Sequence, residues 1–153
     1  MLENTESRGD LLVGILAGLV AALISAVVWA AIPFLTDHEY GVVAIALGAF
    51  VGFAVRWGGR GSSMTFGVVG AACAVLAIAI GNVFAVIAFV LRDYNVTLAE
   101  VLAILDFETI WQVLSADFTV IDGLFYLFAI YEGFRFAIVP GARAVTAPQT
   151  PPA

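Results

Sequence analysis

The sequence predicts an all-α, polytopic membrane protein with four transmembrane helices and short amphipathic helices between the third and the fourth. Two observations support this fold class. The chain of 153 residues is 63% hydrophobic and only 12% charged, which is too little charge to cover the surface of a soluble domain of this size. The hydrophobic residues also collect in several nearly uncharged runs of about 18 residues or more, the length that crosses a bilayer as a helix.

The first two predicted spans lie in the N-terminal half. Residues 11–35 form the first span, after a cytoplasmic segment, 1–10, whose Asp10 is placed to cap the helix. Residues 41–57 form the second span, which is short, at about 26 Å by helical rise. The two spans would cross the membrane in opposite directions.

The other two predicted spans are residues 64–91, long enough to cross with tilt, and residues 118–139, which end at Pro140. The tail 140–153 is polar and rich in proline, and we expect it to be disordered and cytoplasmic. The four spans together make one membrane domain, 11–139.

Residues 92–117 form the one sizeable piece between spans. Thr97 and Glu100 have the spacing of a capping box that opens a short helix, and Asp106 can cap a second short helix that runs through Leu114. The segment contains five acidic residues and one arginine, hence a net charge of −4. We expect an amphipathic elbow on the outer membrane surface, either a simple connector or a docking platform for a partner.

The basic residues predict the orientation of the spans. All six are arginines, and an alternating four-span topology puts five of them on one side and only Arg92 on the other. The positive-inside rule then places both termini in the cytoplasm. The absence of lysine, with abundant alanine, valine and glycine, is typical of a prokaryotic protein, so we expect the cytoplasmic (inner) membrane.

Several function classes are disfavoured by the sequence. The formal net charge of −6 is the opposite of the basic surface that nucleic acid requires. The sequence contains no nucleophile–base pattern, no zinc-binding HExxH motif and no phosphate-binding Walker loop. We therefore expect no catalytic residues, no metal site, no cofactor and no enzymatic activity.

Small residues spaced four apart form a stripe on each predicted span. Such stripes allow membrane helices to approach closely. They serve either packing within one four-helix bundle or association of several copies of the chain. The helix-packing positions are Gly14, Gly18, Ala44, Gly48, Gly52, Gly81, Ala129 and Gly133.

Charged residues inside the last span form the main candidate site. Glu132 and Arg135 lie one turn apart, and Arg56 ends the small-residue stripe of the second span. If the stripes of the second and fourth spans face one another in parallel, Arg56 approaches Glu132 as well. Because an isolated charge in a bilayer is costly, we expect a buried charge cluster that fixes helix register, moves a proton or ion, or anchors a lipid head group.

A polar pathway along the fourth span is a second possibility. Asp122 lies near its outer end, and the hydroxyls of Tyr126 and Tyr131 could lie between Asp122 and Glu132. The ten residues between the two acids turn them about 80° apart around the helix, which weakens the case for one narrow path.

Two stretches carry a resemblance to a known family. Residues 40–61 hold a glycine-rich helix that ends in arginine, and residues 125–137 hold the pattern Ala-Ile-x-x-Gly. In these features the chain resembles an uncharacterised bacterial family of small four-span inner-membrane proteins. The resemblance covers most of the chain and implies the fold, without an activity.

Two functions are consistent with these observations. The first is a non-enzymatic integral membrane scaffold or accessory subunit, which associates with a second copy or a membrane-protein partner through its small-residue faces. The second is a small oligomeric transporter or channel with Glu132 in its pathway.

Overall fold

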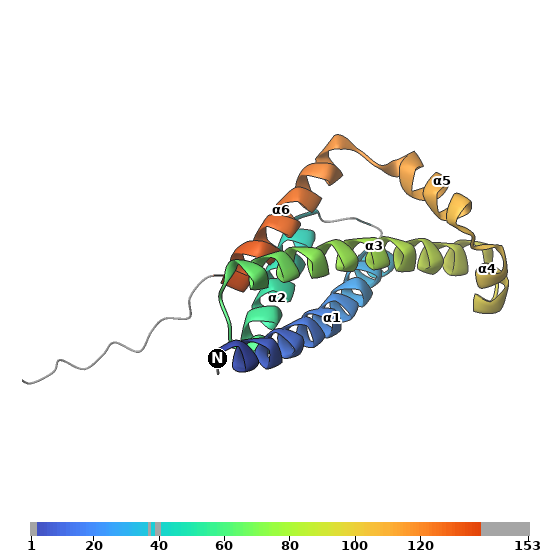
Figure 1. Ribbon diagram of the computed structural model, residues 1–153. Coiled ribbons are helices and arrows are strands. Elements are labelled where there is room, and N and C mark those ends of the chain that lie inside the picture. The colour runs from blue at the N-terminus through green and yellow to red at the C-terminus, as the bar shows by residue number, and fades with distance from the viewer. Residues whose placement is uncertain (1–2, 37, 39–40, 139–153) are drawn as a thin grey trace, which may run out of the picture.

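The structure, a computed structural model, describes residues 3–36, 38 and 41–138, and in this part of the chain all regular structure is helical. Four long helices form a bundle, and two short ones form an arm that projects from it (Figure 1). The bundle contains α1 (Glu3–Thr36), α2 (Gly41–Gly59), α3 (Met64–Tyr94) and α6 (Val120–Ile138). The arm contains α4 (Leu98–Ile104) and α5 (Phe107–Asp117), and we call it the outer arm because it lies outside the bundle.

The helices confirm an all-α polytopic membrane protein. Three of them are long and apolar enough to cross a membrane, over Leu11–Thr36, Gly41–Gly59 and Met64–Tyr94. Helix α6 has three charged residues among its 19, and it is apolar enough to cross a membrane only when it is combined with α5. The two helices meet at an angle of 109°, and the described residues contain three candidate spans, or four if this bent pair is one span.

The described helices differ from the predicted boundaries at several ends. Helix α1 begins at Glu3, so the prediction that Asp10 caps it is wrong. The reason is that adding a residue to an existing helix gains one hydrogen bond, and residues 3–9 contain no proline to end the helix. Helix α3 continues to Tyr94 and ends at Asn95, whose φ of 50° is left-handed. The predicted tail 140–153 lies outside the described residues.

The caps of the outer arm follow the sequence closely. Thr97 and Glu100 form the predicted capping box, with the Thr97 backbone N–H donating to Glu100 at 2.8 Å. Asp106 caps α5 by accepting from the Thr109 backbone N–H at 2.7 Å, and α5 then runs to Asp117, beyond the predicted end. These local hydrogen bonds fix where each short helix starts.

The long helices alternate in direction. Gly14 of α1 lies against Gly59 and Phe66, at the end of α2 and the start of α3. Gly67 of α3 lies against Ile138 at the end of α6. The start of α1, the end of α2, the start of α3 and the end of α6 therefore meet at one end of the bundle, as the alternating topology predicts.

The closest helix contact joins α2 to α6. A Cβ built on Gly48 would overlap the backbone carbonyl oxygen of Ala129, and a Cβ on Gly52 would overlap that of Gly133. A Cβ on Gly70 of α3 would overlap the same Gly133 oxygen. Three helices thus meet backbone to backbone, which only glycine allows. The small-residue stripes of α2 and α6 face one another in parallel.

Glycines of both α1 and α3 allow these two helices to pack closely. A Cβ on Gly18 would lie 2.9 Å from the Cys73 sulfur, and a Cβ on Gly81 of α3 would lie 2.9 Å from the indole of Trp29. These are contacts with side chains rather than backbone. All the glycines predicted to pack helices therefore contact other helices of the same chain.

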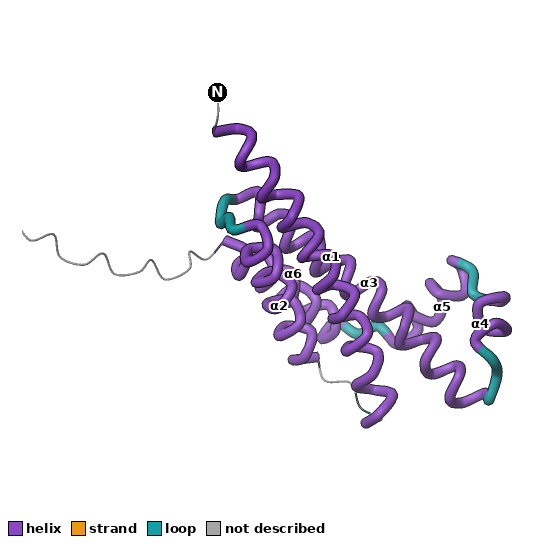
Figure 2. Tube along the Cα trace, turned by 90° about the horizontal axis from the view of Figure 1, so that it is seen from below, coloured by secondary structure: helices purple, strands orange, loops and turns teal. Residues whose placement is uncertain are grey.

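The outer arm lies apart from the bundle. Figure 2 shows α4 and α5 beside the far end of α3, away from α1 and α2. Within the arm only Val101 is fully buried, whereas Phe107 is 81% exposed. The bundle is tightly packed by small residues, and the arm leaves most of its apolar side chains accessible.

Candidate functional site

The charged residues of α6 form a close pair. The Arg135 Nη1 lies 3.3 Å from the Glu132 Oε1, across one turn of helix. The Glu132 side chain is only 16% exposed, whereas that of Arg135 is 54% exposed. The arginine lies at the surface of the bundle and partly neutralises a carboxylate that is mostly covered.

Arg56 occupies the last turn of α2, one turn beyond Gly52. Its guanidinium lies 5.3 Å from the centre of the Phe53 ring, a cation–π contact. Because α2 and α6 are parallel and Gly52 faces Gly133, Arg56 lies on the same helix pair as Glu132. Direct pairing of Arg56 with Glu132 stays a prediction.

The three residues of the proposed polar pathway have different surroundings. Asp122 accepts from the backbone N–H and the hydroxyl of Thr119, at 2.9 and 2.6 Å, and so caps the start of α6. Tyr126 points into the bundle, and Tyr131 is 57% exposed on another face. The structure brings Asp122 and Tyr126 to one cavity, and it separates both from Glu132.

An asparagine in α3 is the centre of a polar cluster that the sequence analysis missed. The Asn82 Oδ1 accepts from the Trp29 indole at 3.3 Å and from the Tyr126 hydroxyl at 3.0 Å, and its Nδ2 donates to the Ile78 carbonyl at 3.0 Å. The cluster therefore joins α1, α3 and α6. The available signal was a single amide in a long apolar run, since polar side chains in membrane helices usually pair across helices.

Aromatic contacts surround this asparagine. The Trp29 and Tyr126 rings meet edge to face, with centroids 6.3 Å apart, and Phe118 lies 6.0 Å from Tyr126 on the other side. These contacts hold the Tyr126 hydroxyl against Asn82.

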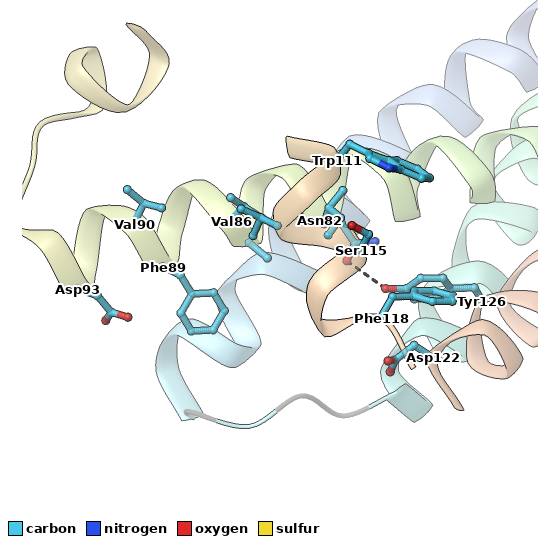
Figure 3. Close-up of a pocket in the computed structure, with 13 residues that line it drawn as sticks. Asn82, Val86, Phe89, Val90, Asp93, Trp111, Ser115, Phe118, Asp122 and Tyr126 are labelled. Atoms are coloured by element: carbon cyan, nitrogen blue, oxygen red, sulfur yellow. Dashed lines mark hydrogen bonds between the residues drawn. The ribbon is translucent and has the colours of Figure 1, made fainter. Parts of the chain in front are cut away.

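A large cavity lies beside the cluster, between the outer half of α3 and the chain from α5 into α6 (Figure 3). Its volume is about 820 Å³, within the range of ligand-binding cavities, and it is partly open to the surroundings. Asn82 and Tyr126 form part of its wall. Apolar side chains form most of the rest, among them Val86, Phe89, Val90, Trp111 and Phe118.

A second cavity, of about 20 Å³, lies inside the bundle on the other side of Tyr126. Ser25 of α1 lines it, and Ala44 and Gly48 of α2 form part of its wall. Ser25 is 1% exposed, and its hydroxyl has no hydrogen-bond partner among the described residues. Glu132 lines neither of these two cavities.

Two carboxylates of the outer arm have lowered pKa values. Hydrogen bonds from the Thr97 backbone N–H and hydroxyl lower the pKa of Glu100. Hydrogen bonds from the Thr109 hydroxyl and backbone N–H lower the pKa of Asp106. These two groups therefore stay ionised to a lower pH than ordinary carboxyl groups do. Among the described residues no three histidine, cysteine, aspartate or glutamate side chains gather as a metal site.

Comparison of the chain with protein-family models, curated proteins and solved structures finds no match in any of the three. The resemblance to the four-span bacterial family stays a prediction that rests on its sequence motifs.

Proposed function

We propose that this protein is a non-enzymatic accessory subunit of the cytoplasmic membrane, which docks onto a membrane-protein partner through its outer arm, α4 and α5. The observation that carries the proposal is the exposure of apolar side chains on an arm set apart from the bundle (Figure 1). Ile104 and Phe107 are 66% and 81% exposed. Grouped apolar surface of this kind is typical of a contact with lipid or protein.

The packing of the bundle supports the choice of the arm. Gly48, Gly52 and Gly133 are already in contact with backbone of the same chain. A partner could use these glycines only by separating α2 from α6. The arm is available for docking without such a change.

The charge of the arm favours one kind of partner. Residues 92–117 have a net charge of −4, and the caps at Glu100 and Asp106 favour the ionised carboxylates. Complementary charge raises the rate and the specificity of association. The partner should therefore present arginine or lysine at its outer membrane surface.

The test is native mass spectrometry of the tagged protein, extracted in mild detergent from its own membrane. The Glu108→Lys variant reverses a charge on α5 that caps no helix, and Ser62→Lys places the same basic side chain on an exposed loop at the opposite end of the bundle. We expect a complex of defined stoichiometry with another membrane protein for the wild type and for Ser62→Lys, and its loss for Glu108→Lys. A monomer, or a complex that Glu108→Lys leaves intact, would overturn docking through the acidic arm.

Transport is the alternative function, and the low exposure of Glu132 within a bilayer segment favours it. Purified protein in proteoliposomes can be tested for proton flux with an enclosed pH-sensitive dye. Under this alternative Glu132→Gln abolishes flux with the fold intact, and Glu108→Gln, the same change on the arm, preserves it. Equal flux in Glu132→Gln and wild type contradicts the alternative.

A further inference from the structure

The cavity between α3 and the α5–α6 corner has the composition of a binding site for an amphiphile. The cavity has a volume of about 820 Å³, and Figure 3 shows the side chains from α3, α5 and α6 that surround it. Val86 and Val90 line it from α3, Trp111 lines it from α5, and Phe118 lines it from the corner between α5 and α6. A cavity mainly lined by apolar groups, with a few fixed polar ones, is the usual form of a small-molecule site.

The polar group that could orient a ligand is Asn82. Its Oδ1 accepts two hydrogen bonds from within the bundle, and one of the two Nδ2 hydrogens goes to the Ile78 carbonyl. An amide NH₂ has two hydrogens, so the second can donate to a ligand oxygen. The side chain is held from three helices, and this donor therefore has a fixed position.

The charges around the cavity select against an anionic ligand. Asp93 and Asp122 belong to its lining, and among the described residues no basic side chain does. Asp93 is paired with Arg92 at 3.0 Å, whereas Asp122 accepts only from the uncharged groups of Thr119 among the described contacts. A phosphate or carboxylate near Asp122 would meet a like charge in surroundings of low dielectric constant.

We propose that this cavity binds an uncharged amphiphile, with its apolar chain between α3 and α5 and a hydroxyl or carbonyl oxygen at the Asn82 amide. The site is separate from the charged surface of the arm that the proposed function uses. The proposal also accounts for the space between α3 and the apolar side chains of α5, because the ligand fills this space.

The probe for the test is ω-brominated dodecanol, because bromine quenches tryptophan fluorescence on contact. The Trp57→Phe variant in nanodiscs of zwitterionic lipid retains Trp111, which lines the cavity, and Trp29. Its Trp57→Phe/Trp111→Phe derivative gives the background from Trp29. We expect quenching of Trp111 that saturates with the alcohol and that unbrominated dodecanol reverses by competition.

Matched variants locate the site and its anchor. Val90→Phe places a ring in the part of the cavity proposed to hold the apolar chain and should weaken the saturable quenching, whereas Val75→Phe, the same change on an exposed part of α3, should not. Asn82→Leu should weaken binding about tenfold through the lost hydrogen bond. Brominated dodecanoate should bind at least tenfold more weakly than the alcohol.

Three results would count against the proposal. Quenching that rises in proportion to the probe, without saturation or competition, would show that only bulk lipid reaches Trp111, and this would overturn the proposal. Equal binding of alcohol and carboxylate would overturn the charge selection. Absence of quenching by either probe would show that the amphiphile does not reach Trp111, and this would also overturn the proposal.

Discussion

The contact between α2 and α6 makes a sharp prediction about Gly52. In Gly52→Ala the new methyl group would overlap the carbonyl oxygen of Gly133. Real Cβ atoms essentially never approach another atom within 3.0 Å, so α2 and α6 must move apart by roughly an ångström. A side chain could rotate away from such a contact, but a backbone carbonyl cannot. We therefore expect Gly52→Ala to destabilise the bundle.

The size of the effect follows from two opposing terms. Overpacking a tight interface costs about 1–3 kcal/mol. The upper part of that range applies because Gly70 of α3 packs closely against the same carbonyl, so α6 has little room to move. Replacing glycine with alanine inside a helix gains about 1 kcal/mol. The net loss is about 2 kcal/mol, which lowers the melting temperature of a chain of this size by roughly 4–8 °C.

Gly123→Ala in α6 is the matched control. A Cβ on Gly123 meets its nearest neighbour, the tip of the Phe118 ring, at 3.3 Å, a contact that a small ring movement relieves. This variant gains helix propensity of about 0.5 kcal/mol or more without a backbone clash. Thermal unfolding of both variants is followed by tryptophan fluorescence in one detergent. If Gly52→Ala melts at or above the wild-type temperature, as the control should, the close α2–α6 crossing is refuted.

Three further predictions concern polar groups. Ser25→Ala should stabilise the bundle by about 1 kcal/mol, because it removes a buried hydroxyl without a partner among the described residues; a lower melting temperature would show that the hydroxyl is bonded. Arg135→Gln should destabilise the bundle by about 1–2 kcal/mol, a range that takes the exposure of the arginine into account. Adding Glu132→Gln should recover most of this loss in thermal unfolding. Equal melting temperatures of the single variant and the wild type would refute a stabilising pair. The lowered pKa of Asp106 gives stability that is present above the ordinary value of 3.8 and is lost as the pH falls through the lower folded value. Asp106→Asn keeps the cap without the titration, so far-UV circular dichroism should show less acid-induced loss of helix in this variant, and identical acid profiles would contradict the role of the cap.

Local features of the structure were predictable from the sequence. The apolar runs placed the long helices, and the Thr97 and Asp106 caps placed the two short ones. The i,i+3 spacing also brought Glu132 and Arg135 together in α6. These features depend on residues within one or two helical turns, so composition and spacing contain the information.

The facing of α2 and α6 is an intermediate case. Small residues every fourth position showed which side of each helix could pack closely. They did not show whether the partner helix belongs to the same chain. The backbone overlaps at Gly48 and Gly52 assign those contacts to α6 of the same molecule.

The hydrogen-bond partners of Asn82 and the positions of the two cavities could be learned only from the tertiary structure. Asn82 bonds to Trp29 and Tyr126, which are 53 and 44 positions away, and no local pattern specifies such partners. The turn of 109° between α5 and α6 opens the large cavity, whereas the sequence suggested only an elbow. Hydropathy and helical period fix which residues enter the membrane and which face of a helix is apolar. The relative rotation and depth of the helices, which determine the polar contacts between them, arise only when all the faces pack at once.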